Sequence, residues 1–149
     1  MKFSIAKSRM ALILLWFGFL VVDLGILFYL YFDQWIEKNN FLLGMKQINA
    51  SYAPYLGVIT LFYWGSAKTE ARREQAKPGM PFFLAVIGSL LWNGMILLFL
   101  LPPLFKSGVI EEAVENIQTI GESLAWLVSG SIGYYFANPT LTKPGEKKQ

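Results

Sequence analysis

The stretch ALILLWFGFLVVDLGILFYLYF, residues 11–32, indicates the fold class, because it holds one charged residue, Asp23, in 22 positions. A helix of this length rises about 33 Å, at roughly 1.5 Å per residue, which is enough to cross the hydrocarbon core of a bilayer. Lys2, Lys7 and Arg9 precede it, as in a signal peptide, but the apolar run is too long and lacks a small-x-small cleavage site. We therefore predict a retained transmembrane helix.

Three further apolar segments predict transmembrane helices. The second is short, aromatic-rich and carries Pro54, which suits the first turn of a helix. The third contains Pro102-Pro103, which should end the helix or kink its last turn. The fourth is barely long enough to cross a bilayer. The prediction is one all-α integral membrane domain over 1–149, a four-helix bundle with spans at about 11–32, 50–67, 81–105 and 123–138 and a flexible tail at 139–149.

The segment 109–121, which leads into the fourth span, has the pattern of an amphipathic helix. Apolar residues recur at three- and four-residue steps, and glutamates occupy other positions. The apolar positions are Val109, Ile110, Ala113, Val114, Ile117 and Ile120. We expect an amphipathic helix here, on the outer side of the membrane.

Basic residues predict the orientation, because short loops rich in Lys and Arg stay in the cytoplasm. Ten of the 13 lie in the N-terminal tail, the loop between spans two and three, and the C-terminal tail: Lys2, Lys7, Arg9, Lys68, Arg72, Arg73, Lys77, Lys143, Lys147 and Lys148. The remaining three are Lys38, Lys46 and Lys106. We expect both termini in the cytoplasm and the chain in a membrane of the bacterial cytoplasmic (inner) type.

The two halves of the chain resemble each other. An offset of 72 lays Ala53 on Ala125 and Gly57 on Ser129, and an offset of 70 lays Asp23 on Asn93. The chain is then a duplicated two-helix hairpin whose copies share one orientation and are related by an axis along the membrane normal. Chance similarity between apolar helices is the alternative.

Small residues recur at four-residue steps in the fourth span, at Ala125, Ser129, Gly133 and Ala137. One face of small side chains lets another helix approach closely. The contact is either packing within one chain or an interface between copies. The second span offers Gly57 and Gly65 for the same purpose.

Asp23 lies near the middle of the first span, and no Lys or Arg lies at similar depth to neutralise it. The carboxyl is therefore protonated or faces water, and an ionisable residue at such depth is a functional candidate. Asn93, at the centre of the third span, is its expected hydrogen-bond partner. The pair either holds helices together, lines a path for a proton or cation, or contacts a lipid or ligand.

An acidic rim is expected on the outer side. It includes Glu111, Glu112, Glu115 and Glu122. Such a rim concentrates cations, but it is also what remains when Lys and Arg are kept inside.

Composition excludes much chemistry. The chain is 54% hydrophobic and 15% charged and contains no Cys and no His, so disulfides, thiolates, imidazole catalysis and the commonest metal ligands are absent. No phosphate-binding loop, nucleophile elbow or metal-ligand cluster is present. We expect no enzyme activity, no cofactor and no metal, and a net charge of +3 gives no reason to expect nucleic acid as a partner.

Three functions remain. The first is a small self-associating membrane protein, such as an oligomeric pore, an ion channel or a membrane-permeabilising effector. Four spans enclose little water, so a pore needs several copies. The second is a non-catalytic accessory or regulatory subunit of a larger membrane complex. The third is a carrier of a small molecule or lipid, which ranks last because the prolines lie near predicted span ends and no matched helix breaks are expected at mid-membrane.

Overall fold

The computed structural model describes residues 5–70, 80–105 and 110–137, and these residues form helices and no strand. The predicted tail, 139–149, lies outside the described residues. The helices are α1 (Ile5–Phe32), α2 (Lys38–Glu70), α3 (Met80–Leu104), α4 (Ile110–Ser123) and α5 (Ala125–Ala137).

Two of these helices are long and apolar enough to cross a membrane. They cover Lys7–Phe32 in α1 and Met80–Leu104 in α3. Both are apolar around most of their circumference, so periodicity does not give them one inner face. The helix α3 runs through Pro102 and Pro103 and ends directly after them, at Leu104.

The helix α2 begins twelve residues before the predicted second span, at Lys38 rather than residue 50. Pro54 therefore lies inside a 33-residue helix and not in its first turn, so that expectation was wrong. The early part of α2 contains Lys46, Gln47 and Asn49, which lower its hydropathy. The hydropathy of the sequence therefore did not indicate that the helix starts before residue 50. These polar residues share the helix with Ile48 and Tyr52, which are buried.

The helix α4 covers most of the segment for which an amphipathic helix is predicted. It buries Ile110, Ala113, Val114 and Ile117 and exposes Glu111, Glu112 and Glu115. Val109 lies outside the described residues. A one-residue interruption at Leu124 separates α4 from α5, so the fourth predicted span consists of α5 alone.

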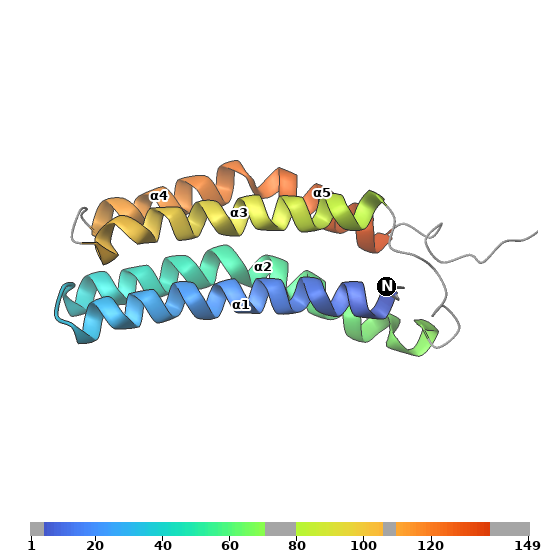
Figure 1. Cartoon of the computed structure of the whole chain (residues 1–149), viewed down its shortest axis with the longest axis horizontal. Coiled ribbons are helices and arrows are strands. Elements are labelled where there is room, and N and C mark those ends of the chain that lie inside the picture. Colours follow the sequence, from blue (N-terminus) through green and yellow to red (C-terminus); the bar gives the residue numbers. More distant parts are fainter. Residues whose placement is uncertain (1–4, 71–79, 106–109, 138–149) are drawn as a thin grey trace, which may run out of the picture.

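The helices form two hairpins that lie side by side (Figure 1). One consists of α1 and α2, and the other of α3 with α4 and α5. Across the boundary, α1 lies against α3 and α2 lies against α4, while the backbones of α1 and α4, and those of α2 and α3, do not approach closely in the described chain. Equivalent helices of the two hairpins are thus neighbours and run in the same direction.

This arrangement differs from the predicted symmetry. A two-fold axis along the bundle would place α1 diagonally from α3 and next to α4. The contacts instead relate the hairpins by a sideways translation, as in stacked helical repeats. The common orientation of the two hairpins agrees with the prediction, but the axis was wrong.

Side-chain packing between neighbours fills the bundle. Gly44 of α2 allows Leu27 of α1 to approach, since a Cβ at residue 44 would lie 2.9 Å from Leu27 Cδ1. Gly88 of α3 accepts Ser131 of α5 in the same way, with 2.9 Å to its Oγ. The largest fully buried side chains are Trp16, Trp92, Tyr52, Tyr135, Leu12, Leu27, Leu30, Ile48, Ile59, Ile96, Leu100 and Ile117.

A Schellman motif ends α1. The amide of Trp35 donates to the carbonyl of Leu30 at 2.9 Å, and that of Gln34 donates to Tyr31 at 3.1 Å. Gln34 occupies the left-handed position, with φ 61°, where glycine is preferred. The ring of Trp35 then packs edge-on against Tyr29, which closes the turn.

We predict that Gln34→Gly raises the Tm of the purified protein by about 2–4 °C. A side chain in the left-handed region costs roughly 1 kcal/mol, and glycine removes that cost. Gln34→Ala is the control, because it keeps the Cβ atom that causes the strain. Equal melting temperatures for the two variants would contradict this account of the turn.

Candidate functional site

Four aromatic side chains meet at the centre of the bundle. Trp16 of α1 lies 5.0 Å from Trp92 of α3 and 5.8 Å from Tyr52 of α2, measured between ring centroids. Tyr55, one turn along α2, lies 5.0 Å from Trp16 and 5.3 Å from Trp92. The separations are those of favourable aromatic pairs, so this cluster joins three helices.

The two tryptophans also carry hydrogen bonds. The indole of Trp16 donates to Ser89 Oγ at 2.9 Å, between α1 and α3. The indole of Trp92 donates to the carbonyl of Gly121 at 3.3 Å, between α3 and α4. Each buried N–H thus has a partner, as an apolar interior requires.

Asp23 lies in this interior and is fully buried. Its Oδ2 accepts a hydrogen bond from the hydroxyl of Tyr52 at 2.5 Å, while its Oδ1 has no hydrogen-bond partner. The sequence did not identify Tyr52 as a partner of Asp23, because a second span that starts at residue 50 places Tyr52 near its end rather than at the depth of Asp23. Asp23 is thus a buried group in a polar contact, and its role stays a prediction.

Asn93 is also fully buried, but its hydrogen bond goes elsewhere. Its Nδ2 donates to the carbonyl of Ser89, one turn back in α3, at 2.6 Å. Its Oδ1, like Asp23 Oδ1, is buried without a hydrogen-bond partner. The structure therefore places both predicted residues in the core of neighbouring helices, with different hydrogen-bond partners instead of each other.

A line of polar side chains joins α2 to α4 on the opposite side of the bundle from the α1–α3 contact. The amide of Asn40 donates to Glu111, and the amide of Gln47 donates to Gln118. Gln118 in turn donates to Glu122 Oε1 at 3.0 Å. Both inter-helix bonds join residues 71 positions apart, so α2 and α4 lie in register over two turns.

A cavity of about 270 Å³, which is open to the surroundings on one side, continues this line of contacts; we call it the seam cavity. Its lining consists of Gln47, Ala50, Ser51, Pro54, Tyr55, Gln118, Gly121, Glu122 and Ala125. Apart from Tyr55, these are four residues of α2 and the four residues that lie 71 positions later. The register of the two hairpins thus creates two walls of equivalent residues.

Each wall contains a position where the regular helical hydrogen bonding is disturbed. In α2, Pro54 has no N–H, so the carbonyl of Ala50 lacks its usual donor four residues on. In the opposite wall the helix breaks at Leu124, between α4 and α5. In Figure 1, α2 and the α4–α5 pair both change direction part-way along the bundle. Because α2 itself is continuous through Pro54, the expectation that the halves lack matched helix breaks stays a prediction.

The predicted ladder of small residues lies outside the core. Ser129 is exposed, its hydroxyl bonds to the carbonyl of Ala125 at 2.6 Å, and Ala125 and Gly133 are half-buried. A Cβ at Gly133, or at Gly57 of α2, would meet nothing within 4 Å. The surroundings of Gly65 and Ala137 lie outside what the structure describes. The contact that α5 makes with α3 instead uses Gly88 and Ser131, which the four-residue pattern did not reveal.

The four predicted rim glutamates are all exposed, but they do not form one cluster. Glu111 accepts from Asn40 near the start of α4, whereas Glu122 lines the seam cavity about three turns later. Glu112 and Glu115 lie between them in sequence and are exposed.

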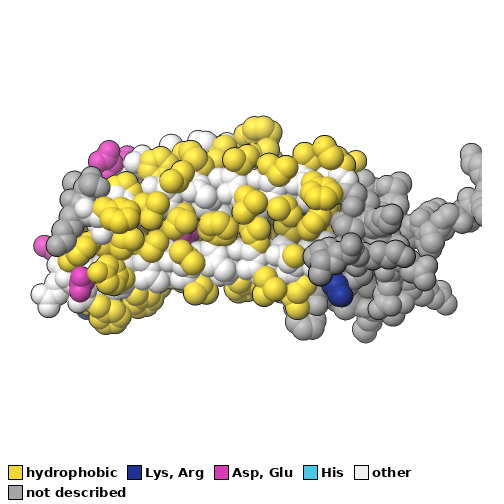
Figure 2. Space-filling model, viewed as in Figure 1, with side chains coloured by type: hydrophobic (Ala, Val, Ile, Leu, Met, Phe, Trp, Pro, Cys, Tyr) yellow, Lys and Arg dark blue, Asp and Glu magenta, His cyan; other side chains and the backbone are white. Residues whose placement is uncertain are grey.

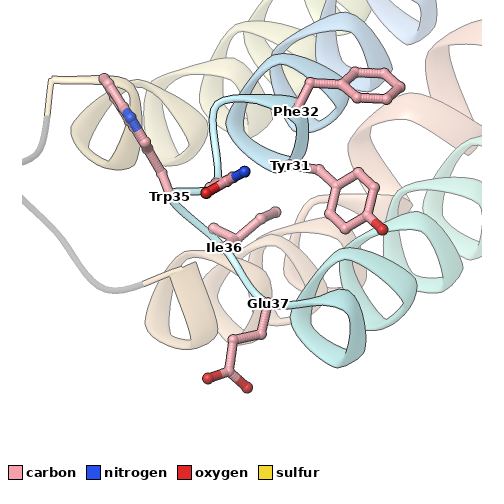
Figure 3. A pocket seen from close by; sticks show the side chains of 6 residues that line it. Tyr31, Phe32, Trp35, Ile36 and Glu37 are labelled. Atoms are coloured by element: carbon pink, nitrogen blue, oxygen red, sulfur yellow. The ribbon is translucent and has the colours of Figure 1, made fainter.

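A second hollow lies at the loop between α1 and α2 (Figure 3). Its volume is about 640 Å³, it is open to the surroundings, and its lining comes from one stretch, 31–37, with Glu37 as the charged residue. Figure 3 shows Glu37 pointing away from the rings of Tyr31 and Phe32. With one loop as its lining, this hollow brings no separate chemical groups together.

No protein-family model, no curated protein and no solved structure matches this chain. The function is therefore argued from the geometry.

We predict that Tyr52→Phe destabilises the fold by roughly 1–3 kcal/mol, because it leaves the buried carboxyl of Asp23 without its donor. Replacing both partners, in Asp23→Leu/Tyr52→Phe, should recover much of the loss. Tyr55→Phe is the matched control, since Tyr55 packs on the same tryptophans and makes no hydrogen bond to a described residue. Thermal unfolding in one detergent measures all variants. A double variant as unstable as the sum of the single ones would contradict a coupled pair.

Proposed function

We propose that this chain is an integral membrane protein whose four helical segments cross the bilayer together, and whose copies assemble around an aqueous path that conducts ions. The observation that carries the proposal is the difference between two sides of the bundle. One side is apolar along its length, and the other is polar over half of it.

The common extent of the segments along the bundle supports four crossings. In Figure 1, α2 and the α4–α5 pair extend alongside α1 and α3 from one end of the bundle to the other. Since α1 and α3 are long and apolar enough to cross a membrane, the helices packed along them would occupy the same thickness. Hydrocarbon also favours this arrangement, because helices satisfy their own backbone polar groups.

The helices α1 and α3 supply the side that suits lipid. Large apolar side chains project from them at every level, and Figure 2 shows such side chains from one end of the described bundle to the other. The exposed set includes Leu14, Phe17, Val21, Val22, Phe28 and Phe32 of α1 and Phe83, Ile87, Leu91 and Leu98 of α3. An apolar surface of this extent is unfavourable in water and favourable against acyl chains.

The early halves of α2 and α4 supply a side that does not suit lipid. Their exposed residues include Lys38, Asn39, Lys46, Asn49, Glu111, Glu112, Glu115, Gln118, Thr119 and Glu122. Ionised side chains in hydrocarbon cost several kcal/mol each by most estimates, so this face needs water or a polar partner. An assembly that turns the polar faces of several copies toward one axis provides the water and places α1 and α3 against lipid.

The ladder of small residues supports self-association. Ala125 lines the seam cavity with Glu122, and Ser129 and Gly133 follow at four-residue steps in α5. Because no atom of the described residues lies within 4 Å of a Cβ placed at Gly133, a helix of another copy could approach closely there.

Charge supports the proposed orientation. Lys7 and Arg9 lie at the end of the bundle where α1 begins, and Asp33, Glu37 and Glu111 lie toward the opposite end. With Arg72, Arg73, Lys77 and the C-terminal basic residues, which lie outside the described residues, this favours both termini in the cytoplasm of a bacterial cell.

An accessory subunit is the second candidate, and the same polar face favours it. Docking against the polar surface of a partner protein would cover that face as well as water does. The two functions differ in what the purified protein does alone.

The test uses single cysteines, which need no background removal because the chain has none. We predict that Thr119→Cys in proteoliposomes reacts with a charged, water-soluble thiol reagent and that the reaction lowers cation flux. Val22→Cys, also exposed and about 14–15 Å from the same end of the bundle by residue count, should stay unreactive until the protein is denatured in SDS.

Equal reactivity of the two cysteines in the bilayer would contradict the proposed difference between the two faces. A reactive Thr119→Cys in a preparation that carries no flux at any voltage would reject the pore and leave the accessory subunit.

We predict further that Gly133→Leu shifts the protein to smaller species in mild detergent, measured by mass photometry or light scattering. Gly130→Leu is the matched control, since residue 130 is also open within one copy but is not on the ladder. Identical size distributions for the two variants would exclude the ladder as the contact between copies.

A further inference from the structure

We infer that the seam cavity binds a small monovalent cation that keeps part of its water shell. This inference rests on the proposed function and extends it, because it places an ion site where the polar face ends, beside the junction of α4 and α5. The cavity lies within one copy, between α2 and the α4–α5 junction, so the site does not require assembly.

The lining of the seam cavity supplies oxygen atoms that can coordinate a cation. Pro54 and Ala50 both line the cavity, and the missing proline N–H leaves the Ala50 carbonyl without its helical donor. Ser51 adds a hydroxyl, and Gln47 uses its amide N–H toward Gln118, which leaves its Oε1 as an acceptor. Backbone carbonyls that lack their helical hydrogen-bond donor are a known means of coordinating monovalent ions in membranes.

The charge of the lining also suits a monovalent cation. Glu122 is the one carboxylate in the lining, and no Lys or Arg accompanies it. Gln118 donates to Glu122 Oε1, and Gln118 in turn accepts from Gln47, so a chain of amides orients the carboxylate. A single negative charge with neutral oxygens around it suits a singly charged cation better than a divalent one.

The volume of the seam cavity suits an ion that keeps part of its water shell. A cavity of about 270 Å³ is far larger than a bare metal ion and has room for several waters at roughly 30 Å³ each. The described residues also contain no group of three acidic or other metal-ligating side chains. The site therefore fits an ion with water attached rather than a divalent ion enclosed by carboxylates.

The aromatic cluster gives the site a readout. Tyr55 lines the cavity and lies 5.0 Å from Trp16 and 5.3 Å from Trp92, so binding should change tryptophan emission. A cation near the Tyr55 ring also gains from the electron-rich face.

The experiment titrates the detergent-purified full chain with RbCl against N-methylglucamine chloride at constant ionic strength, and records tryptophan emission and Tm. We expect saturable Rb⁺-dependent changes in both, since a ligand of the native state raises stability. Glu122→Gln should weaken the apparent affinity by about tenfold, because it removes the charge and keeps an acceptor for Gln118. Glu115→Gln, exposed on the same helix but outside the lining, should bind as the parent does.

Pro54→Ala tests the freed carbonyl separately. It restores an N–H to α2 and should raise Tm, since proline inside a helix costs about 3 kcal/mol, so a loss of Rb⁺ binding cannot be attributed to misfolding. We expect the affinity to fall severalfold in this variant.

No saturable response to Rb⁺, or equal losses in Glu122→Gln and Glu115→Gln, would overturn the cation site while leaving the pore open to the cysteine test. Rb⁺ binding in a protein that carries no flux would overturn the pore and keep the site. A response to N-methylglucamine equal to that to Rb⁺ would also overturn the inference, because it would show no selection by size.

Discussion

The structure depends on one constraint, which is that helices of very different polarity lie side by side over the same length. Two of them, α1 and α3, are apolar enough to cross a membrane, and the early halves of α2 and α4 expose amides and charges. No uniform solvent suits both. Water would face a large apolar surface on one side, and hydrocarbon would face exposed glutamates on the other. The proposed assembly, or a protein partner, would give each of the two sides an environment that suits it.

Side-chain hydrogen bonds hold these unlike helices together at each boundary. Asp23 and Tyr52 join α1 to α2, Trp16 and Ser89 join α1 to α3, Trp92 and the Gly121 carbonyl join α3 to α4, and Gln47 and Gln118 join α2 to α4. Three of the four boundaries use a large aromatic ring with a polar group at its edge. Such side chains fill space and carry a hydrogen bond as well, which lets the interior hold a carboxyl group among tryptophans.

Sequence predicted the features that depend on local pattern. The apolar runs of α1 and α3 and the alternation of Ile110, Ala113, Val114 and Ile117 with glutamates are visible in short windows, and the helices lie where those patterns are. The start of α2 was missed because Lys46, Gln47 and Asn49 lower the hydropathy of a helix that is half polar.

The seam cavity could not be found in this way, because it depends on the register between two hairpins. That register pairs Gln47 with Gln118, and the offset of 72 drawn from small residues misses this match by one position.

The translation between hairpins matters for the same reason. A two-fold axis would have placed α2 diagonally from α4, so equivalent residues would have been separated by the core. Translation places α2 residues such as Gln47 beside their counterparts in α4, and it therefore places Pro54 of α2 opposite the junction of α4 and α5. Pro54 and the α4–α5 junction each disturb the hydrogen bonding of one helix. Because they lie opposite each other, they line one cavity with oxygen atoms on both walls.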